Sequence, residues 1–170
     1  NYGSGGIGTN THLGSELLKS LTGIYVVHIP YKGGGAAMQD LLGNQVQSQV
    51  TALPTALPHV KAGKLRALAV TSETRSGVLP DVPSAPEVGQ PKFLIKFWVG
   101  LSGPAGTPAP VVERLNREVI AAMAQPETKR RIAELGLDIV GNSPAQAQAL
   151  VGDEMARWAA LIKARGIKPE

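Results

Sequence analysis

A run of glycines and hydroxyl side chains opens the chain and leads directly into an amphipathic helix. Residues 2–12 read Tyr-Gly-Ser-Gly-Gly-Ile-Gly-Thr-Asn-Thr-His, and leucines at helical spacing follow: Leu13, Leu17, Leu18 and Leu21. Glycine lets the backbone turn sharply and approach a ligand closely. Such a loop aims backbone N–H groups and the positive end of a helix at one point, which favours a small-anion site.

Two other interpretations of this stretch stay open. Gly3, Gly5 and Gly8 match the G-x-G-x-x-G fingerprint of dinucleotide-binding loops. That fingerprint needs an acidic residue about 20 positions later, after the second strand. Here the second apolar run, residues 25–29, ends in Pro-Tyr-Lys-Gly instead. The remaining alternative is a tight strand-to-helix turn that holds no ligand.

Composition narrows the class of protein. With 170 residues the chain is long enough for one large or two small domains. Its net charge is +4, and the basic residues are scattered apart from 129–131, so nucleic acid is not expected as a partner. The absence of cysteine excludes disulfides and thiolate chemistry. No apolar run is long enough for a transmembrane helix.

Helical and strand-like segments alternate along the chain, which favours an α/β fold with largely parallel sheets. We expect strands at 25–29, 46–53, 65–71, 93–101 and 137–140, and helices at 10–22, 36–42, 54–62 and 126–136, with two more that begin at Pro108 and Pro144. The nearly apolar run 65–71 predicts a central strand, covered on both faces. Thr107 is expected to cap the helix that follows, with Pro108 in its first position. Ser143 and Gln146 fit a capping box.

The sequence offers no catalytic constellation. His12, His28 and His59 are far apart in the chain and follow no metal-ligand spacing, and the carboxylates lie mostly on helical surfaces. His12 falls in the first turn of the first helix, so we expect a structural residue near the glycine loop rather than a general base. We therefore predict no catalytic residue, no metal and no cofactor.

Several ordered motifs resemble one family. They are Asn1-Tyr-Gly-Ser4, His28-Ile-Pro-Tyr-Lys-Gly33, the stretch from Leu57 to Ser72, Leu79-Pro-Asp-Val-Pro83, the stretch from Pro104 to Asn116, and Gly166-Ile-Lys-Pro-Glu170. Together they resemble the Bug/TctC-type extracytoplasmic solute-binding proteins of tripartite tricarboxylate transport systems. The resemblance extends over the chain from end to end.

The resemblance implies a two-lobed fold of the type II periplasmic-binding-protein class, here without the N-terminal half of lobe one. Residues 1–95 would form lobe two, and residues 96–170 the returning part of lobe one. Such a protein is a periplasmic receptor that binds a small carboxylate, delivers it to membrane permease subunits and catalyses nothing. Open sheet edges and an apolar face on 96–170 would favour a homo-oligomer of this chain.

The resemblance also suggests which residues contact the ligand. The loop residues Gly3, Ser4, Gly6, Gly8 and Thr9 are similar to the ligand-facing loop of the family. Where family members read Val-Asp-Val-Met-Phe-Asp-Asn-Leu-Pro, residues 46–54 read Val-Gln-Ser-Gln-Val-Thr-Ala-Leu-Pro, so Thr51 takes the place of a ligand-side Asp. A neutral hydroxyl there favours a plain carboxylate or an aromatic acid over an amino acid.

Two other classes of function remain as alternatives. The effector-binding domain of a transcriptional regulator shares the two-lobed plan and would carry a helix-turn-helix segment upstream. An enzyme that holds a phosphate or nucleotide in the glycine loop is the second alternative, and the absence of a placed base or metal set argues against it.

Overall fold

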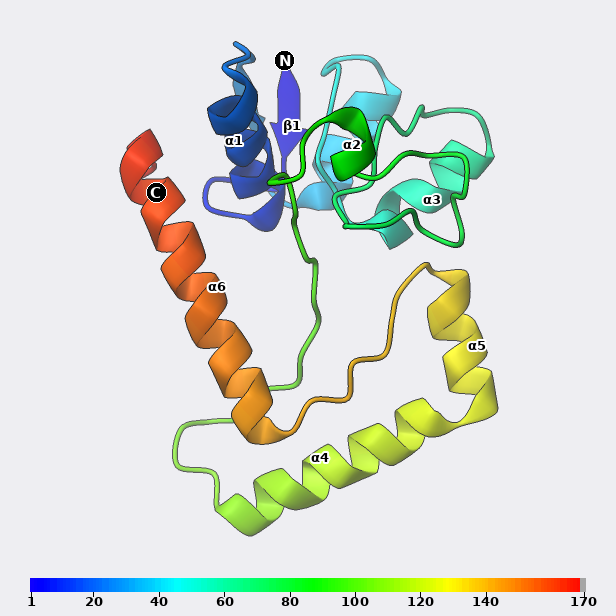
Figure 1. Cartoon of the computed structure of the whole chain (residues 1–170), viewed down its shortest axis with the longest axis vertical. Helices are drawn as coiled ribbons and strands as arrows, with labels where there is room; N and C mark the ends of the chain where they lie inside the picture. Colours follow the sequence, from blue (N-terminus) through cyan, green and yellow to red (C-terminus); the bar gives the residue numbers. More distant parts are fainter. Residues whose placement is uncertain (169–170) are drawn as a thin grey trace. The chain divides into compact units, whose positions relative to one another are not determined.

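The glycine-rich stretch lies in the part of the molecule built on two short parallel strands. The structure is a computed structural model and describes residues 1–168. Two compact units make it up: residues 1–97 with the chain from Trp158 onward, and residues 98–157. Its elements along the chain are β1 (Tyr2–Ser4), α1 (Asn10–Thr22), β2 (His28–Pro30), α2 (Gly34–Leu42), α3 (Leu53–Lys61), the 3₁₀ turn η1 (Pro86–Val88), α4 (Ala109–Ala124), α5 (Pro126–Glu134) and α6 (Pro144–Arg165) (Figure 1).

The strand β1 is hydrogen-bonded on both of its edges. On one side β1 and β2 pair in parallel, with Tyr2 opposite His28. On the other side the Gly3 N–H donates to the Ser48 carbonyl at 3.0 Å, and Tyr2 forms an isolated parallel bridge with Ser48. The loops that follow β1, β2 and the segment at Ser48 therefore leave the same edge of the sheet.

Helices α1 and α2 pack against opposite faces of β1 (Figure 1). The Tyr2 side chain reaches Glu16 on α1. Because successive strand residues point to opposite faces, Gly3 faces α2, and a Cβ built on it would lie 3.4 Å from the Ala37 Cβ. This close approach accounts for glycine at position 3.

Local signals define α1 at both ends. Thr9 is the N-cap, and its side chain accepts from the His12 N–H at 3.4 Å. Gly23 closes the helix in the left-handed conformation, at φ 71°, with its N–H donating to the Lys19 carbonyl. The predicted bounds of this helix, residues 10–22, are confirmed.

The apolar core of the first unit gathers around Phe93 and Ile95. Leucines of α1, Val50 and Trp158 pack against this pair. Gly14 lets α1 come close, because a Cβ there would lie 2.8 Å from the Ile95 side chain and 2.9 Å from that of Val50. The segment 93–101 was predicted as a strand; it forms no strand, and its first residues anchor this core instead.

The predicted central strand at 65–71 is wrong. The segment forms only a single isolated bridge, in which the Val70 N–H donates to the Pro83 carbonyl. Proline has no N–H to donate in return, so a regular ladder cannot continue there. Leu68 is 71 % exposed, which excludes a central position.

Other strand predictions also need correction. Segment 46–53 contributes only the bridge at Ser48, segment 137–140 is irregular, and the strand expected at 25–29 is instead β2, at His28–Pro30. A segment forms a strand only where a neighbouring segment pairs with it through backbone hydrogen bonds. Few segments within residues 1–168 have such a partner.

The second unit consists of α4, α5 and most of α6, joined by irregular segments. Ser143 and Gln146 form the predicted capping box: the Ser143 N–H donates to Gln146 Oε1 at 2.9 Å, and the Gln146 N–H donates to Ser143 Oγ at 3.3 Å. The predicted cap at Thr107 is wrong. Pro108 is the N-cap of α4, and the Thr107 hydroxyl donates instead to the Pro104 carbonyl.

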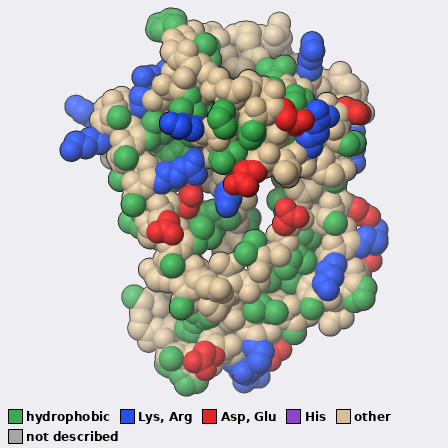
Figure 2. All heavy atoms as spheres, viewed as in Figure 1, with side chains coloured by type: hydrophobic (Ala, Val, Ile, Leu, Met, Phe, Trp, Pro, Cys, Tyr) green, Lys and Arg blue, Asp and Glu red, His purple; other side chains and the backbone are tan. Residues whose placement is uncertain are grey.

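Large hydrophobic side chains are exposed on the second unit. None of residues 98–157, all of which are described, is fully buried, and Val99 is 97 % exposed. Figure 2 shows hydrophobic side chains at the surface of the part that holds α4. The exposed apolar side chains predicted for 96–170 are thus confirmed in the described part, whereas residues 169–170 lie outside it. The open sheet edges predicted for the same segment are wrong, because residues 96–168 form no strand. The proposed lobes, 1–95 and 96–170, stay a prediction.

Candidate functional site

The loop between β1 and α1 has the backbone geometry that its glycines predict. Gly6 has φ 123° and Gly8 has φ 76°, which are backbone conformations that residues with a Cβ rarely adopt. A Cβ on Gly5 would lie 3.0 Å from the Gly34 nitrogen, where α2 begins. The loop is therefore tightly turned and lies against the start of α2.

Most polar groups of this loop are already hydrogen-bonded within the chain. The Gly6 N–H donates to Ser4 Oγ at 3.1 Å, and the Gly8 N–H donates to His12 Nδ1 at 3.1 Å. The Thr9 hydroxyl donates to the Gly6 carbonyl at 2.7 Å, and the Thr9 N–H donates to the same carbonyl at 3.3 Å. The predicted residues thus shape the loop from within.

Three N–H groups of the loop and the first turn of α1 remain available. Within residues 1–168, the N–H groups of Ile7, Asn10 and Thr11 have no acceptor. Asn10 and Thr11 form the first turn of α1, where the helix dipole is positive. The free donors therefore belong to residues adjacent to the predicted ones. The sequence indicated the loop, but it did not indicate which residues shape the loop and which carry the free N–H groups.

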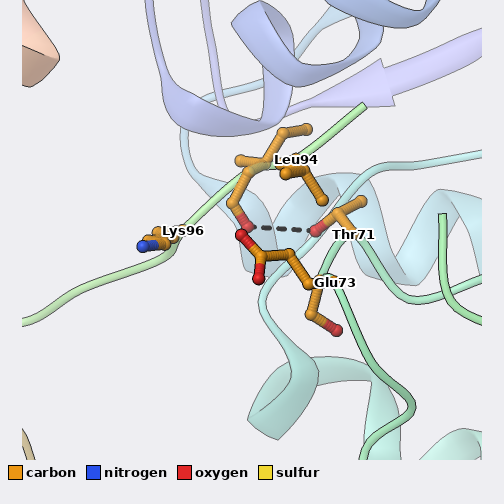
Figure 3. Close-up of a pocket in the computed structure, with 6 residues that line it drawn as sticks. Thr71, Glu73, Leu94 and Lys96 are labelled. Atoms are coloured by element: carbon orange, nitrogen blue, oxygen red, sulfur yellow. Dashed lines mark hydrogen bonds between the residues drawn. The ribbon is translucent and has the colours of Figure 1, made fainter. Parts of the chain in front are cut away.

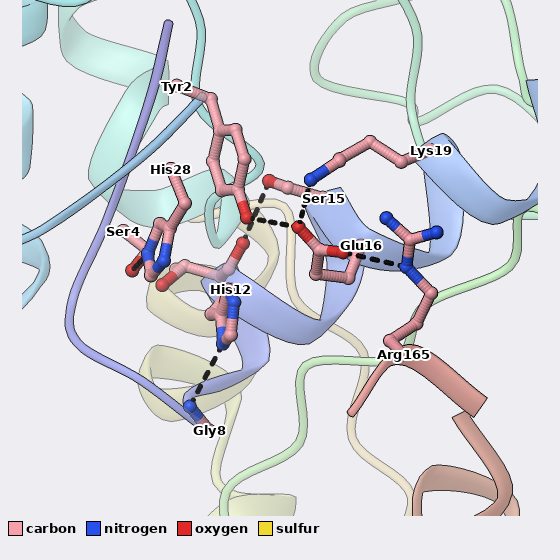
Figure 4. Close-up of polar contacts among 10 residues, drawn as sticks. Tyr2, Ser4, Gly8, His12, Ser15, Glu16, Lys19, His28 and Arg165 are labelled. Atoms are coloured by element: carbon pink, nitrogen blue, oxygen red, sulfur yellow. Dashed lines mark hydrogen bonds and ion pairs between the residues drawn. The ribbon is translucent and has the colours of Figure 1, made fainter. Parts of the chain in front are cut away.

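A stack of three aromatic rings lies beside the loop (Figure 4). The His12 and His28 rings are stacked with centroids 4.0 Å apart, and the Tyr2 and His28 rings with centroids 4.9 Å apart. The Ser4 hydroxyl lies 2.6 Å from His28 Nε2. Sequence reasoning placed His12 near the loop, but the pairing of His12 with His28 needs the β1–β2 register.

Glu16 carries the negative charge of this cluster. Its carboxylate accepts hydrogen bonds from Tyr2 OH at 2.8 Å, Lys19 Nζ at 2.6 Å and Arg165 Nε at 2.9 Å, although Glu16 is only 6 % exposed (Figure 4). Burial alone would raise its pKa, but these three hydrogen bonds outweigh burial and lower the pKa to about 2. Burial, followed by the contact with Glu16, raises the pKa of Tyr2.

Thr51 lies on a different segment from the loop. It is half-buried in the irregular stretch between Ser48 and α3, immediately after Val50, whose side chain packs on Gly14. Neighbouring Gln49 has a buried side-chain amide, and neither its oxygen nor its nitrogen has a partner within residues 1–168. Because the segment at Ser48 runs parallel to β1, Gln49 and Thr51 follow at the edge where the glycine loop begins.

A separate shallow groove of about 240 Å³ lies elsewhere in the first unit, between residues 71–73 and 94–96 (Figure 3). Its walls are joined by two hydrogen bonds, from the Ile95 N–H to the Thr71 carbonyl and from Thr71 Oγ1 to the Ile95 carbonyl. None of the predicted site residues lines this groove.

The described residues hold neither a metal-type cluster nor a membrane-spanning helix. No group of three or more histidines and carboxylates in residues 1–168 is arranged to hold a metal ion. None of the helices in the same range combines the length and apolar character needed to cross a membrane.

Comparison with known proteins places the chain in a family. The family model described as "Tripartite tricarboxylate transporter family receptor" matches residues 1–167. Protein BugT of Bordetella pertussis is 36 % identical over 162 residues, which are 95 % of this chain and 50 % of that protein. The chain thus spans about half the length of the curated relatives it matches first.

Solved structures agree with this match. An R. palustris protein solved with adipate superposes with a TM-score of 0.92 at 34 % identity, over 99 % of this chain and 56 % of that one. The periplasmic binding protein BugD gives 0.88 at 36 % identity, over 99 % and 57 %. MatC of Rhodopseudomonas palustris with bound malate gives 0.88 at 33 % identity, over 95 % and 56 %. The predicted α/β periplasmic-binding-protein fold is confirmed, and the chain belongs to the tripartite tricarboxylate transporter receptor family of Bug/TctC solute-binding proteins.

Proposed function

We propose that the whole protein is a periplasmic receptor that captures a small carboxylate and delivers it to a tripartite tricarboxylate-type membrane transporter. The observation that carries the proposal is the pair of solved relatives that hold adipate and malate. Both ligands are dicarboxylates, so the shared chemistry is a carboxylate group. The family's description as a transporter receptor supports the permease as the second partner.

The loop between β1 and α1 is the proposed seat of one carboxylate group. The N–H groups of Ile7, Asn10 and Thr11 are unpaired within residues 1–168; Ile7 lies in the loop, and Asn10 and Thr11 belong to the positive end of α1. Oriented N–H groups and a helix dipole stabilise an anion without a buried cation. In this proposal the predicted ligand-binding residues hold those donors in place: Gly3, Ser4, Gly6, Gly8 and Thr9.

Thr51 is proposed to set the preference among carboxylates. It offers a hydroxyl and no charge where the resemblance places an aspartate, so it cannot form an ion pair with a ligand ammonium group. A carboxylate without an amine is therefore the expected ligand class. Buried unpaired charge would penalise an amino acid here.

Calorimetric titration of the whole protein tests this proposal. Adipate, malate and aspartate are the probes, and we expect the first two to bind more tightly than aspartate. Gly8→Val should weaken binding by about tenfold or more, because valine is strained at φ 76°. Gly89→Val is the matched control, since Gly89 also has φ 76° and equally open surroundings but closes η1. Equal affinity in both variants would remove the loop from the site.

Association and localisation have separate tests. The exposed side chains of residues 98–157 support a homo-oligomer of the 170-residue chain, which light scattering would detect as a dimer, and a monodisperse monomer would contradict it.

Release of the whole protein by osmotic shock would support a periplasmic localisation. Retention with cytoplasmic markers would instead favour the regulator alternative.

A further inference from the structure

His12 holds the loop through its side chain as well as through its place in the helix. It is the third residue of α1 after the N-cap Thr9, and its Nδ1 accepts the Gly8 N–H at 3.1 Å. In a capping box, the side chain of this same helix position reaches back to an N–H before the helix. Here an imidazole does so, which requires a lone pair on Nδ1 and places the ring proton on Nε2.

His28 holds the other end of the same loop. Its Nε2 lies 2.6 Å from Ser4 Oγ, and that hydroxyl in turn accepts the Gly6 N–H at 3.1 Å. The two imidazoles stack with centroids 4.0 Å apart and planes at 11°. The loop that carries the free N–H groups is thus anchored at Ser4 and Gly8 by a histidine pair.

The surroundings of the pair favour its neutral form. Burial lowers the pKa of His12, and burial together with the neighbouring His12 lowers the pKa of His28 to about 4. The positive end of α1 acts in the same direction on His12. The other charged or titratable groups at the cluster are Tyr2 on β1, Glu16 and Lys19 on α1, and Arg165 on α6. Glu16 is the one anion among them, and its charge is shared with Lys19 and Arg165.

We propose that His12 is a positioning residue for carboxylate binding: its neutral imidazole fixes the Gly8 amide and so holds the free N–H groups of the loop toward the ligand. The inference rests on the proposed function for the identity of the ligand. Its structural part, the Nδ1 anchor of Gly8, does not. Protonation of the pair removes the acceptor on His12 and places two cations in one stack, so the loop loses its geometry in acid.

Two variants of the whole protein separate the acceptor from the bulk of the ring. His12→Asn retains an oxygen acceptor near the position of Nδ1, whereas His12→Leu fills the space without an acceptor. The first readout is hydrogen exchange of the Gly8 amide by NMR at neutral pH. We expect exchange to quicken by about tenfold in His12→Leu and to stay within about threefold of wild type in His12→Asn. Equal exchange in all three proteins would overturn the proposal.

The second readout is the affinity for adipate between pH 7.5 and pH 4.5. Because protonation of adipate itself affects every protein equally, the measured quantity is the ratio of the His12→Asn affinity to the wild-type affinity. We expect this ratio to rise by about threefold or more as pH falls, since asparagine does not titrate. A ratio that is flat with pH would overturn the proposal, even if His12→Leu fails to fold.

These readouts distinguish the inference from the function on which it rests. If the wild-type protein binds no carboxylate in calorimetry, the proposed function fails, while Gly8 exchange still decides whether His12 anchors the loop. If carboxylates bind and the exchange rate of the Gly8 amide is the same in the His12 variants as in the wild type, the inference fails and the proposed function stands.

Discussion

The two units of this chain bury their side chains to very different degrees. The first unit encloses a charged network around Glu16 and an apolar core around Phe93 and Ile95. In the second unit, residues 98–157, no side chain is fully buried, and the ion pairs that Arg130 forms with Glu127 and Glu134 lie in solvent. The same kinds of interaction should therefore contribute much more to stability in the first unit, because burial removes the water that competes with them.

The largest expected contrast is between two glutamates, each with more than one cationic partner. Glu16→Gln leaves Lys19 and Arg165 beside a neutral group in a buried site, so we expect a loss of about 2–4 kcal/mol in unfolding free energy. Glu127→Gln is the matched control, because Glu127 pairs with Arg130 and Arg131 but is exposed. We expect it to cost less than about 1 kcal/mol. Urea unfolding measures both, and equal losses would contradict the contrast.

The next contrast is in the response to acid, because every histidine of the sequence lies in the first unit. The folded state holds His28 at a pKa of about 4, below the ordinary value of 6.5. The unfolded chain then binds more protons, so this stabilisation is present above pH 6.5 and is lost as pH falls toward 4. We expect a loss of about 2 kcal/mol over that window.

Protection factors from hydrogen exchange locate this loss. Amides of α1 should lose protection between pH 6.5 and pH 4.5, whereas amides of α4 should not. A second loss below pH 4.5 is expected as the pKa of Glu16, about 2 when folded, is approached. If the amides of α1 and α4 lost protection equally above pH 4.5, the histidines would not be the cause.

A smaller contrast compares two helical glycines. Gly14→Ala places a methyl group 2.8 Å from the Ile95 side chain, so overpacking should cost about 1–3 kcal/mol despite the better helix propensity of alanine. Gly152→Ala in α6 meets nothing within 4 Å, so it should stabilise that helix by about 0.5–1 kcal/mol. Thermal unfolding of both variants tests the opposite signs, and a shared sign would break the comparison.

The smallest expected effect is a gain within the first unit. Gln49 buries an amide without a hydrogen-bond partner in residues 1–168. Gln49→Met should therefore stabilise the fold by about 1 kcal/mol, because the desolvated amide is removed. Gln39→Met, at an exposed position of α2, is the control and should change little. A destabilised Gln49→Met would mean that the amide has a partner when the whole protein folds.

Features that depend on neighbours in sequence were predictable. Thr9 and Gly23 delimit α1, and Ser143 with Gln146 opens α6, because caps are closed by groups two to four residues apart. The turned geometry of the glycine loop was predictable for the same reason, since positive φ at Gly6 and Gly8 is a local requirement. The family followed from ordered motifs along the whole chain.

Features that depend on distant partners were not predictable from the residues. An apolar run such as 65–71 becomes a strand only if another segment supplies its ladder, and Pro83 cannot. The His12–His28 stack requires α1 to pack against the paired strands β1 and β2, and the ion pair of Glu16 with Arg165 joins residues 149 positions apart. Sequence by itself determined the helix ends, the turned glycine loop and the family, because those follow from short-range chemistry. Only the tertiary structure decided which imidazoles contact the loop, at Gly8 and at Ser4, because those contacts form after the chain has brought remote segments together.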